Sequence, residues 1–140
     1  MKGLRIAKDI IFLVCGIMSI VSSVTLITLS GVFIGFSTPG ARDVMIEQLN
    51  NGTLTTSFPG TPEEQVMAIQ ALLLSLAISF ILITLFSVAN AIISFMCRKK
   101  GNKTLYILAI VFGALSGQEL NIVGGVFGLI THRNEQTIIY

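Results

Sequence analysis

The sequence has no tryptophan, two cysteines and three prolines, and only 11% of its 140 residues are charged. Soluble domains ordinarily carry about 25% charged residues. With 53% hydrophobic residues and a mean hydropathy of +0.85, the chain is typical of proteins whose solvent is lipid rather than water. Both cysteines, Cys15 and Cys97, are predicted at the cytoplasmic side, so no disulfide framework is expected.

The motifs that common chemistries require are also missing. The sequence contains no CxxC pair, no phosphate-binding loop and no Ser-His-Asp set. His132 is the only histidine and has no cysteine or carboxylate cluster beside it, so we expect no metal and no cofactor. The net charge of +2 comes from cations next to apolar runs, which membrane orientation explains, and no nucleic-acid partner is expected. We therefore expect a protein that is not an enzyme.

An uncharged run at residues 10–36 is the first long apolar segment. At about 1.5 Å per residue, a helix of this length exceeds the roughly 30 Å hydrocarbon core of a bilayer. Lys2, Arg5 and Lys8 precede the run, as in a signal peptide, but the apolar part of a signal peptide has only about 7 to 15 residues. We therefore predict a retained anchor, helix 10–36.

A polar stretch at residues 37–61 follows, and we expect it to be the outer loop. Thr38 is predicted to cap a short helix within it, with Pro39 at the first helical position. Two helix-start signals and most of the acidic side chains of the chain fall in or next to this loop, which is more local specification than a passive connector needs. An ordered loop without a binding role is the simpler interpretation, and the functional hypothesis is a partner-binding surface with candidate contacts at Arg42, Asp43, Glu47 and Phe58.

The second long helix is predicted over residues 62–97. Thr61 and Glu64 have the spacing of a capping box, and Pro62 takes the first helical position. The uncharged part, residues 71–96, is long enough to span a bilayer.

The remaining apolar region, residues 104–131, is ambiguous. It is too long for one level span and too short for two ordinary spans of roughly 20 residues each. One continuous helix would place Glu119 at mid-membrane, at a cost of several kcal/mol. A hairpin of two short helices, 104–116 and 120–132, would put Glu119 at the far surface instead, and we favour the hairpin while one long span stays the alternative.

Cations set the orientation. They cluster before the first helix and between the second and third, whereas the outer loop is acidic. The positive-inside rule then places both termini in the cytoplasm and requires an even number of spans. The predicted fold is all-α: one multi-pass domain of the cell membrane, residues 1–140, with four transmembrane helices, a short outer loop helix and a short glycine-rich C-terminal hairpin.

Small residues recur at a spacing of four in both long helices, and three GxxxG patterns occur in the chain. Such rows let helix backbones approach closely in lipid. Asn90 is the one strongly hydrogen-bonding side chain inside the second helix, and a structural interhelical bond is its favoured role over a functional polar site. The predicted helix-packing residues are Ser19, Ser23, Gly31, Gly35, Ser75, Ser79, Ser87, Asn90, Gly113, Gly117, Gly124 and Gly128.

The order of these segments, together with the stretch Lys99–Ile130 and its ending "NIVGGVFGLI", resembles the DUF4064 group of small bacterial four-helix membrane proteins. The resemblance covers most of the chain in layout and the last third in residues. It implies a four-helix bundle, but that group has no established activity to transfer.

The sequence therefore predicts a small, non-enzymatic integral membrane protein that acts through protein–protein contacts. An accessory subunit, an immunity-type protein or an envelope-stress component would fit, with membrane lipid and another membrane or envelope protein as partners. The alternative is a small transporter or a holin-like pore that acts as a homo-oligomer. The absence of charge within the helices disfavours ion-coupled transport but not a pore.

Overall fold

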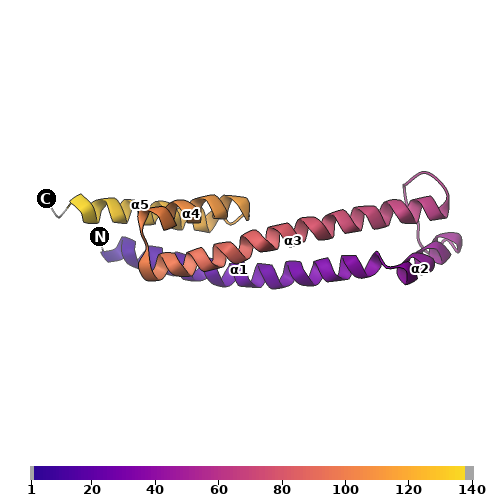
Figure 1. Cartoon of the computed structure of the whole chain (residues 1–140), viewed down its shortest axis with the longest axis horizontal. Coiled ribbons are helices and arrows are strands. Elements are labelled where there is room, and N and C mark those ends of the chain that lie inside the picture. The colour runs from indigo at the N-terminus through magenta and orange to yellow at the C-terminus, as the bar shows by residue number, and fades with distance from the viewer. Residues whose placement is uncertain (1, 138–140) are drawn as a thin grey trace. The chain divides into compact units, whose positions relative to one another are not determined.

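A computed structural model describes residues 2–137, which form five α-helices with no strand among them (Figure 1). Two stretches, Gly3–Phe36 and Pro62–Lys100, are long and apolar enough to cross a membrane. The predicted all-α class is confirmed. The helices are α1 (Lys2–Phe36), α2 (Pro39–Asn50), α3 (Pro62–Lys100), α4 (Lys103–Leu115) and α5 (Glu119–Thr137).

The helices extend beyond the predicted apolar cores at their charged ends. α1 begins at Lys2 rather than at residue 10, and α3 continues to Lys100 rather than to residue 97. Lysine and arginine are good helix formers, and cations in the last turn of α3 interact favourably with the negative end of its dipole. Hydropathy marks where a helix can meet lipid, whereas helix propensity decides where it ends.

The chain, predicted as one domain, forms two compact units. Unit 1 contains the chain up to Thr25 together with the chain from Ile83 onward, and unit 2 is Leu26–Leu82. Each unit therefore includes part of α1 and part of α3, while α4 and α5 belong to unit 1 and α2 to unit 2.

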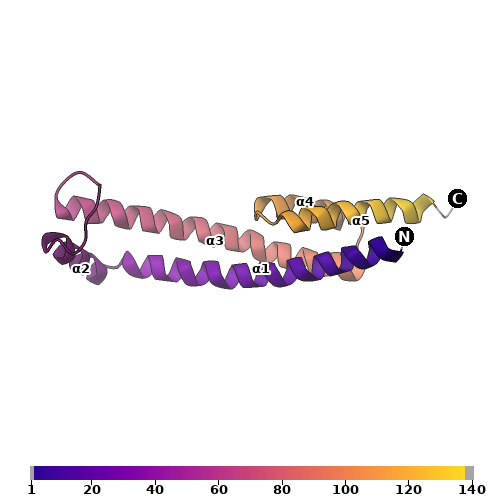
Figure 2. The same ribbon diagram turned by 180° about the vertical axis from the view of Figure 1, so that it is seen from behind.

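In unit 1, α4 and α5 form an antiparallel hairpin and lie side by side in both views (Figures 1 and 2). The predicted helix break is confirmed. α4 ends in a Schellman motif, in which the Gln118 N–H donates to the Gly113 carbonyl at 2.8 Å and the Gly117 N–H donates to the Ala114 carbonyl at 3.3 Å. Gly117 has φ 69°, a backbone conformation that residues with a Cβ rarely adopt. The turn is thus fixed by the position of this glycine.

The apolar core of unit 1 is built around Phe12 and Tyr106, whose rings stack with centroids 6.1 Å apart. Both side chains are almost fully buried. Glycines let α5 reach them, since a Cβ at Gly124 would press on Phe12 and one at Gly128 would overlap the Tyr106 ring. The cluster is completed by Ile93, Cys97 and Ala109.

In unit 2, the rings of Phe33 and Phe80 stack with centroids 5.7 Å apart and so join α1 to α3. The predicted capping box is present: the Thr61 N–H donates to Glu64 Oε2 at 2.9 Å, and the Glu64 N–H donates to Thr61 Oγ1 at 3.4 Å. Both ends of the reciprocal pair are therefore satisfied at the start of α3.

The predicted side-chain cap of α2 is wrong. Thr38 does occupy the capping position, with Pro39 directly after it, but its hydroxyl makes no cap hydrogen bond. The hydroxyl instead donates to the Gly35 carbonyl at 2.8 Å, because the last carbonyls of α1 have no partner within the helix. Gln70 of α3 serves the same end of α1, as its amide nitrogen lies 3.2 Å from the Phe36 carbonyl.

Candidate functional site

A buried cluster of polar side chains lies at the tip of the α4–α5 hairpin. Ser19 of α1 donates its hydroxyl proton to Gln118 Oε1 at 2.6 Å. Asn90 of α3 donates to the same oxygen at 2.7 Å. Gln118 precedes the first residue of α5, so this single amide oxygen binds two long helices to the hairpin turn. We call Ser19, Asn90, Ser94, Gln118 and Asn121 the amide cluster.

The other half of the amide cluster lies one turn further along α5. Asn121 donates its amide to Asn90 Oδ1, and Ser94 Oγ lies 3.1 Å from Asn121 Oδ1. Asn90, Ser94 and Asn121 are all 0% exposed. Burying an amide without a hydrogen bond costs about 1–3 kcal/mol, and here each amide finds a partner. Asn90 of α3 thus makes hydrogen bonds of the interhelical kind that the sequence predicts for it.

The amide cluster is suited to holding helices together rather than to transferring protons or electrons. Its members are amides and hydroxyls, which neither titrate near neutral pH nor act as nucleophiles without an adjacent base. Among the described residues, no group of three histidine, cysteine, aspartate or glutamate side chains is placed to hold a metal ion.

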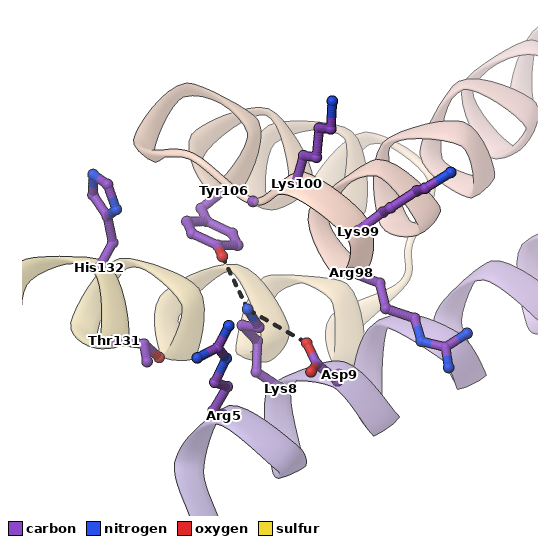
Figure 3. Close-up of a pocket in the computed structure, with 10 residues that line it drawn as sticks. Arg5, Lys8, Asp9, Arg98, Lys99, Lys100, Tyr106, Thr131 and His132 are labelled. Carbon is purple, nitrogen blue, oxygen red and sulfur yellow. Dashed lines mark hydrogen bonds and ion pairs between the residues drawn. The ribbon is translucent and has the colours of Figure 1, made fainter. Parts of the chain in front are cut away.

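A second polar site is a pocket of about 220 Å³ at the other end of the hairpin (Figure 3). It is lined by side chains from α1, α3, α4 and α5. Among the described residues, its ionised lining contains one carboxylate, Asp9, and five cations: Arg5, Lys8, Arg98, Lys99 and Lys100. We call this the basic pocket. Tyr106, Thr131 and His132 complete the polar lining.

Lys8 is the unusual member of the basic pocket because it is only 7% exposed. Its ammonium donates a hydrogen bond to the Tyr106 hydroxyl at 3.0 Å and lies 5.4 Å from the centre of that ring. The same nitrogen lies 3.4 Å from Asp9 Oδ1. That carboxylate oxygen is buried and has no hydrogen bond among the described residues, so the Lys8 ammonium is its main compensation.

The side chains of the basic pocket differ in direction (Figure 3). Arg5 and Lys8 extend from α1 into the same space next to Tyr106, whereas Lys99 and Lys100 extend away from Lys8. The Tyr106 hydroxyl oxygen accepts a hydrogen bond from the Lys8 ammonium, so its own O–H can donate a hydrogen bond elsewhere. The centre of the basic pocket therefore presents two cations and a hydroxyl donor.

The predicted helix-packing residues fall into three groups in the structure. Ser19, Ser23, Ser87 and Asn90 are buried, and a Cβ at Gly113, Gly124 or Gly128 would press on neighbouring side chains. Gly31 and Gly35 face open space, and Ser75 and Ser79 are exposed, with hydroxyls that donate to the carbonyl four residues earlier. Gly117 ends α4 instead of lying on a helix face.

The candidate partner contacts lie in unit 2. Asp43 and Glu47 are exposed on α2, Arg42 beside them is half-buried, and Phe58 in the following loop is 39% exposed. Unit 1 supplies none of them.

Sequence reasoning did not assign Lys8, Tyr106 or Gln118 to a site. Gln118 and Asn121 interrupt the last apolar region, which is a detectable signal for a buried polar contact. Lys8 belongs to a basic cluster that orientation already explains, and Tyr106 carries no signal in the sequence alone.

No protein-family model matches the chain, and no curated protein or solved structure matches it. The resemblance to the DUF4064 group therefore stays a prediction from the residues.

Proposed function

We propose that the chain is a small, non-enzymatic integral membrane protein that acts through contacts with another membrane or envelope protein. An accessory subunit, an immunity-type protein and an envelope-stress component are the roles that fit. The length and apolar character of Gly3–Phe36 and Pro62–Lys100 support membrane insertion. The cations around the basic pocket support a cytoplasmic location for both termini and for the α3–α4 turn.

The α4–α5 hairpin is proposed to enter the membrane from the cytoplasmic side and to return to it. α4 has 13 residues. A helix of that length is about 20 Å long, less than the roughly 30 Å core. The hairpin tip also binds Ser19, the central residue of α1. We therefore favour two complete spans with a re-entrant hairpin over four complete spans, which would require Glu119 to reach the far surface.

The main support for the proposed function is that α2 is an ordered helix with little burial. This helix is fully formed over Pro39–Asn50, yet it contains no buried residue. Val44 is 53% exposed beside the acidic residues Asp43 and Glu47. An ordered helix that has no fully buried residue, and that presents an apolar side chain among charges, is typical of a contact surface.

Site-specific crosslinking in cells tests this surface. A photoreactive amino acid at Val44 is expected to give one discrete adduct with a second protein. The charge reversals Asp43→Lys and Glu47→Lys should abolish the adduct, whereas the matched control Glu63→Lys, at an exposed acidic site on α3, should leave it. No adduct, or an adduct that persists in both reversals, would overturn the proposal.

Replacing residues 50–60 with a flexible linker extends the test. The adduct should be lost while the helices remain folded and inserted, because the helices of unit 1 do not involve this segment. If the adduct still formed after the replacement, the binding surface would have to lie outside the outer segment.

One observation favours the alternative, a pore or small transporter formed by several copies. Glu119 is exposed at the hairpin tip. In a re-entrant hairpin its carboxylate would lie within the hydrocarbon region, where an exposed charge is costly unless water or another copy meets it. Ion flux into proteoliposomes that is lower for Glu119→Gln than for the unchanged protein would support a pore or transporter. Flux no greater than that of empty liposomes would exclude it.

A further inference from the structure

The basic pocket has features that orientation alone does not require. The positive-inside rule needs cations near the helix ends, and exposed lysines would suffice. Lys8 is instead 7% exposed and held between Tyr106 and Asp9. Burying an ammonium is costly unless it is paired and hydrogen-bonded. The fold therefore keeps this cation inside a cavity.

The described lining of the basic pocket is mostly cationic. Of the residues that the structure describes, five cations and one carboxylate, Asp9, line it, and Asp9 Oδ1 lies 3.4 Å from the Lys8 ammonium. The cations come from α1 and α3, segments far apart in the sequence, so the fold assembles them. An anion is the ligand that this field attracts.

The shape and position of the basic pocket narrow the choice of anion. Its volume of about 220 Å³ is several times the roughly 30 Å³ that a water molecule occupies, so a small tetrahedral anion fits. Arginine binds phosphate oxygens in pairs, and Tyr106 can add a hydroxyl donor. The lining residues also lie where the apolar parts of α1 and α3 end, which is the level of lipid headgroups in the proposed topology.

We propose that the basic pocket binds the phosphate group of an anionic phospholipid of the cytoplasmic leaflet. Arg5 provides a guanidinium clamp, Lys8 a fixed positive charge, and Tyr106 the hydroxyl donor that Lys8 orients. Arg98 adds charge at the rim. The inference rests on the proposed membrane insertion, with this end of the helices in the cytoplasm.

Native mass spectrometry of the full chain tests the site. The protein is purified in a nonionic detergent and mixed with phosphatidylglycerol, with phosphatidylcholine, or with inorganic phosphate. We expect one retained phosphatidylglycerol and little phosphatidylcholine. Arg5→Gln should weaken retention about tenfold, the loss of one charge-assisted hydrogen bond, and Arg5→Lys should restore part of it.

The matched control is Lys103→Gln. Lys103 is an exposed cation at the start of α4, near the same chain segment, but it does not line the basic pocket. It should change retention less than about twofold, because Lys103 lies outside the lining of the basic pocket, whereas Arg5 is part of it. Circular dichroism checks that each variant is folded, and Arg98→Gln replaces Arg5→Gln if the latter does not fold.

Three outcomes overturn the proposal: equal retention of the two lipids, an equal loss in Lys103→Gln, or binding of inorganic phosphate without lipid preference. The last would assign the site to a soluble phosphate. If the proposed membrane topology were wrong, cysteine labelling would show it independently of lipid binding. If the proposed partner were wrong, the crosslinked adduct would be missing while lipid retention stayed unchanged.

Discussion

The side-chain amide of Asn121 donates a hydrogen bond to the side-chain oxygen of Asn90, and this contact joins α5 to α3. Both residues are 0% exposed. A rotation of α5 by one residue, about 100°, would separate the two amides and leave both buried without partners. The pair therefore fixes the register of the hairpin against α3.

Asn90→Ala should destabilise the fold by about 1–2 kcal/mol, because Gln118 and Asn121 then lose a partner. Asn121→Ala should cost a similar amount, and the double variant should cost less than the sum. Unfolding in mixed micelles gives the three free energies. The control is Ser75→Ala on the same helix, whose hydroxyl bonds only its own backbone among the described contacts. Additive costs for Asn90 and Asn121 would contradict the coupling.

Gly128→Ala should destabilise the protein by about 1–3 kcal/mol, since the added methyl group would overlap the Tyr106 ring and that ring is packed on Phe12. The thermal midpoint in detergent measures the effect. Gly31→Ala is the matched control, because a methyl group added there would meet no atom within 4 Å outside its own helix turns. Alanine there should be neutral or stabilising by up to about 1 kcal/mol through helix propensity. Equal thermal midpoints for the two variants would show that Gly128 has no special packing role.

Membrane topology is tested by single cysteines and an impermeant thiol reagent applied to intact cells. A cysteine at Gly52 should react from outside, and one at Asn134 should not. The native Cys15 and Cys97 are buried and should stay unlabelled. For the re-entrant hairpin, a cysteine at Glu119 should also be protected. Labelling at Glu119 would indicate four complete spans, and labelling at Asn134 would exclude the hairpin topology altogether.

Thr61→Ala should loosen the start of α3 by about 1 kcal/mol, because the Glu64 N–H loses its side-chain acceptor. Hydrogen exchange at residues 63–66 should speed up about fivefold, which corresponds to that free energy. Thr55→Ala, at an exposed loop position, should leave the exchange rates at these residues unchanged. Unchanged rates in Thr61→Ala would show that Glu64 alone caps the helix.

The sequence was sufficient for the features that depend on local chemistry. Long uncharged runs predict the two long helices, Thr61 and Glu64 predict the start of α3, and Gly117 with Gln118 marks the break between α4 and α5. Each signal is carried by residues that are neighbours along the chain. The expected cap at Thr38 was wrong because the hydroxyl had a competing acceptor, Gly35, at the end of the preceding helix.

The sequence was insufficient where a feature depends on which segments meet. Asn90 was predicted to bond another helix, but its partners Gln118 and Asn121 follow from the packing of the hairpin. Lys8 and Tyr106 are 98 residues apart, and neither residue type at its position indicates the other. A row of small residues is similarly ambiguous, since Gly31 and Gly128 have the same pattern and different surroundings.

The exposed serines of α3 have a consequence for insertion into a bilayer. Ser75 and Ser79 donate to the Ala71 and Ser75 carbonyls at 2.8 and 2.9 Å, so neither hydroxyl proton is left for an outside acceptor. A hydropathy scale assigns each serine the free-energy cost of removing an unbonded hydroxyl from water. Here the hydrogen bonds within the helix offset that cost, so this face of α3 prefers lipid more strongly than its hydropathy indicates.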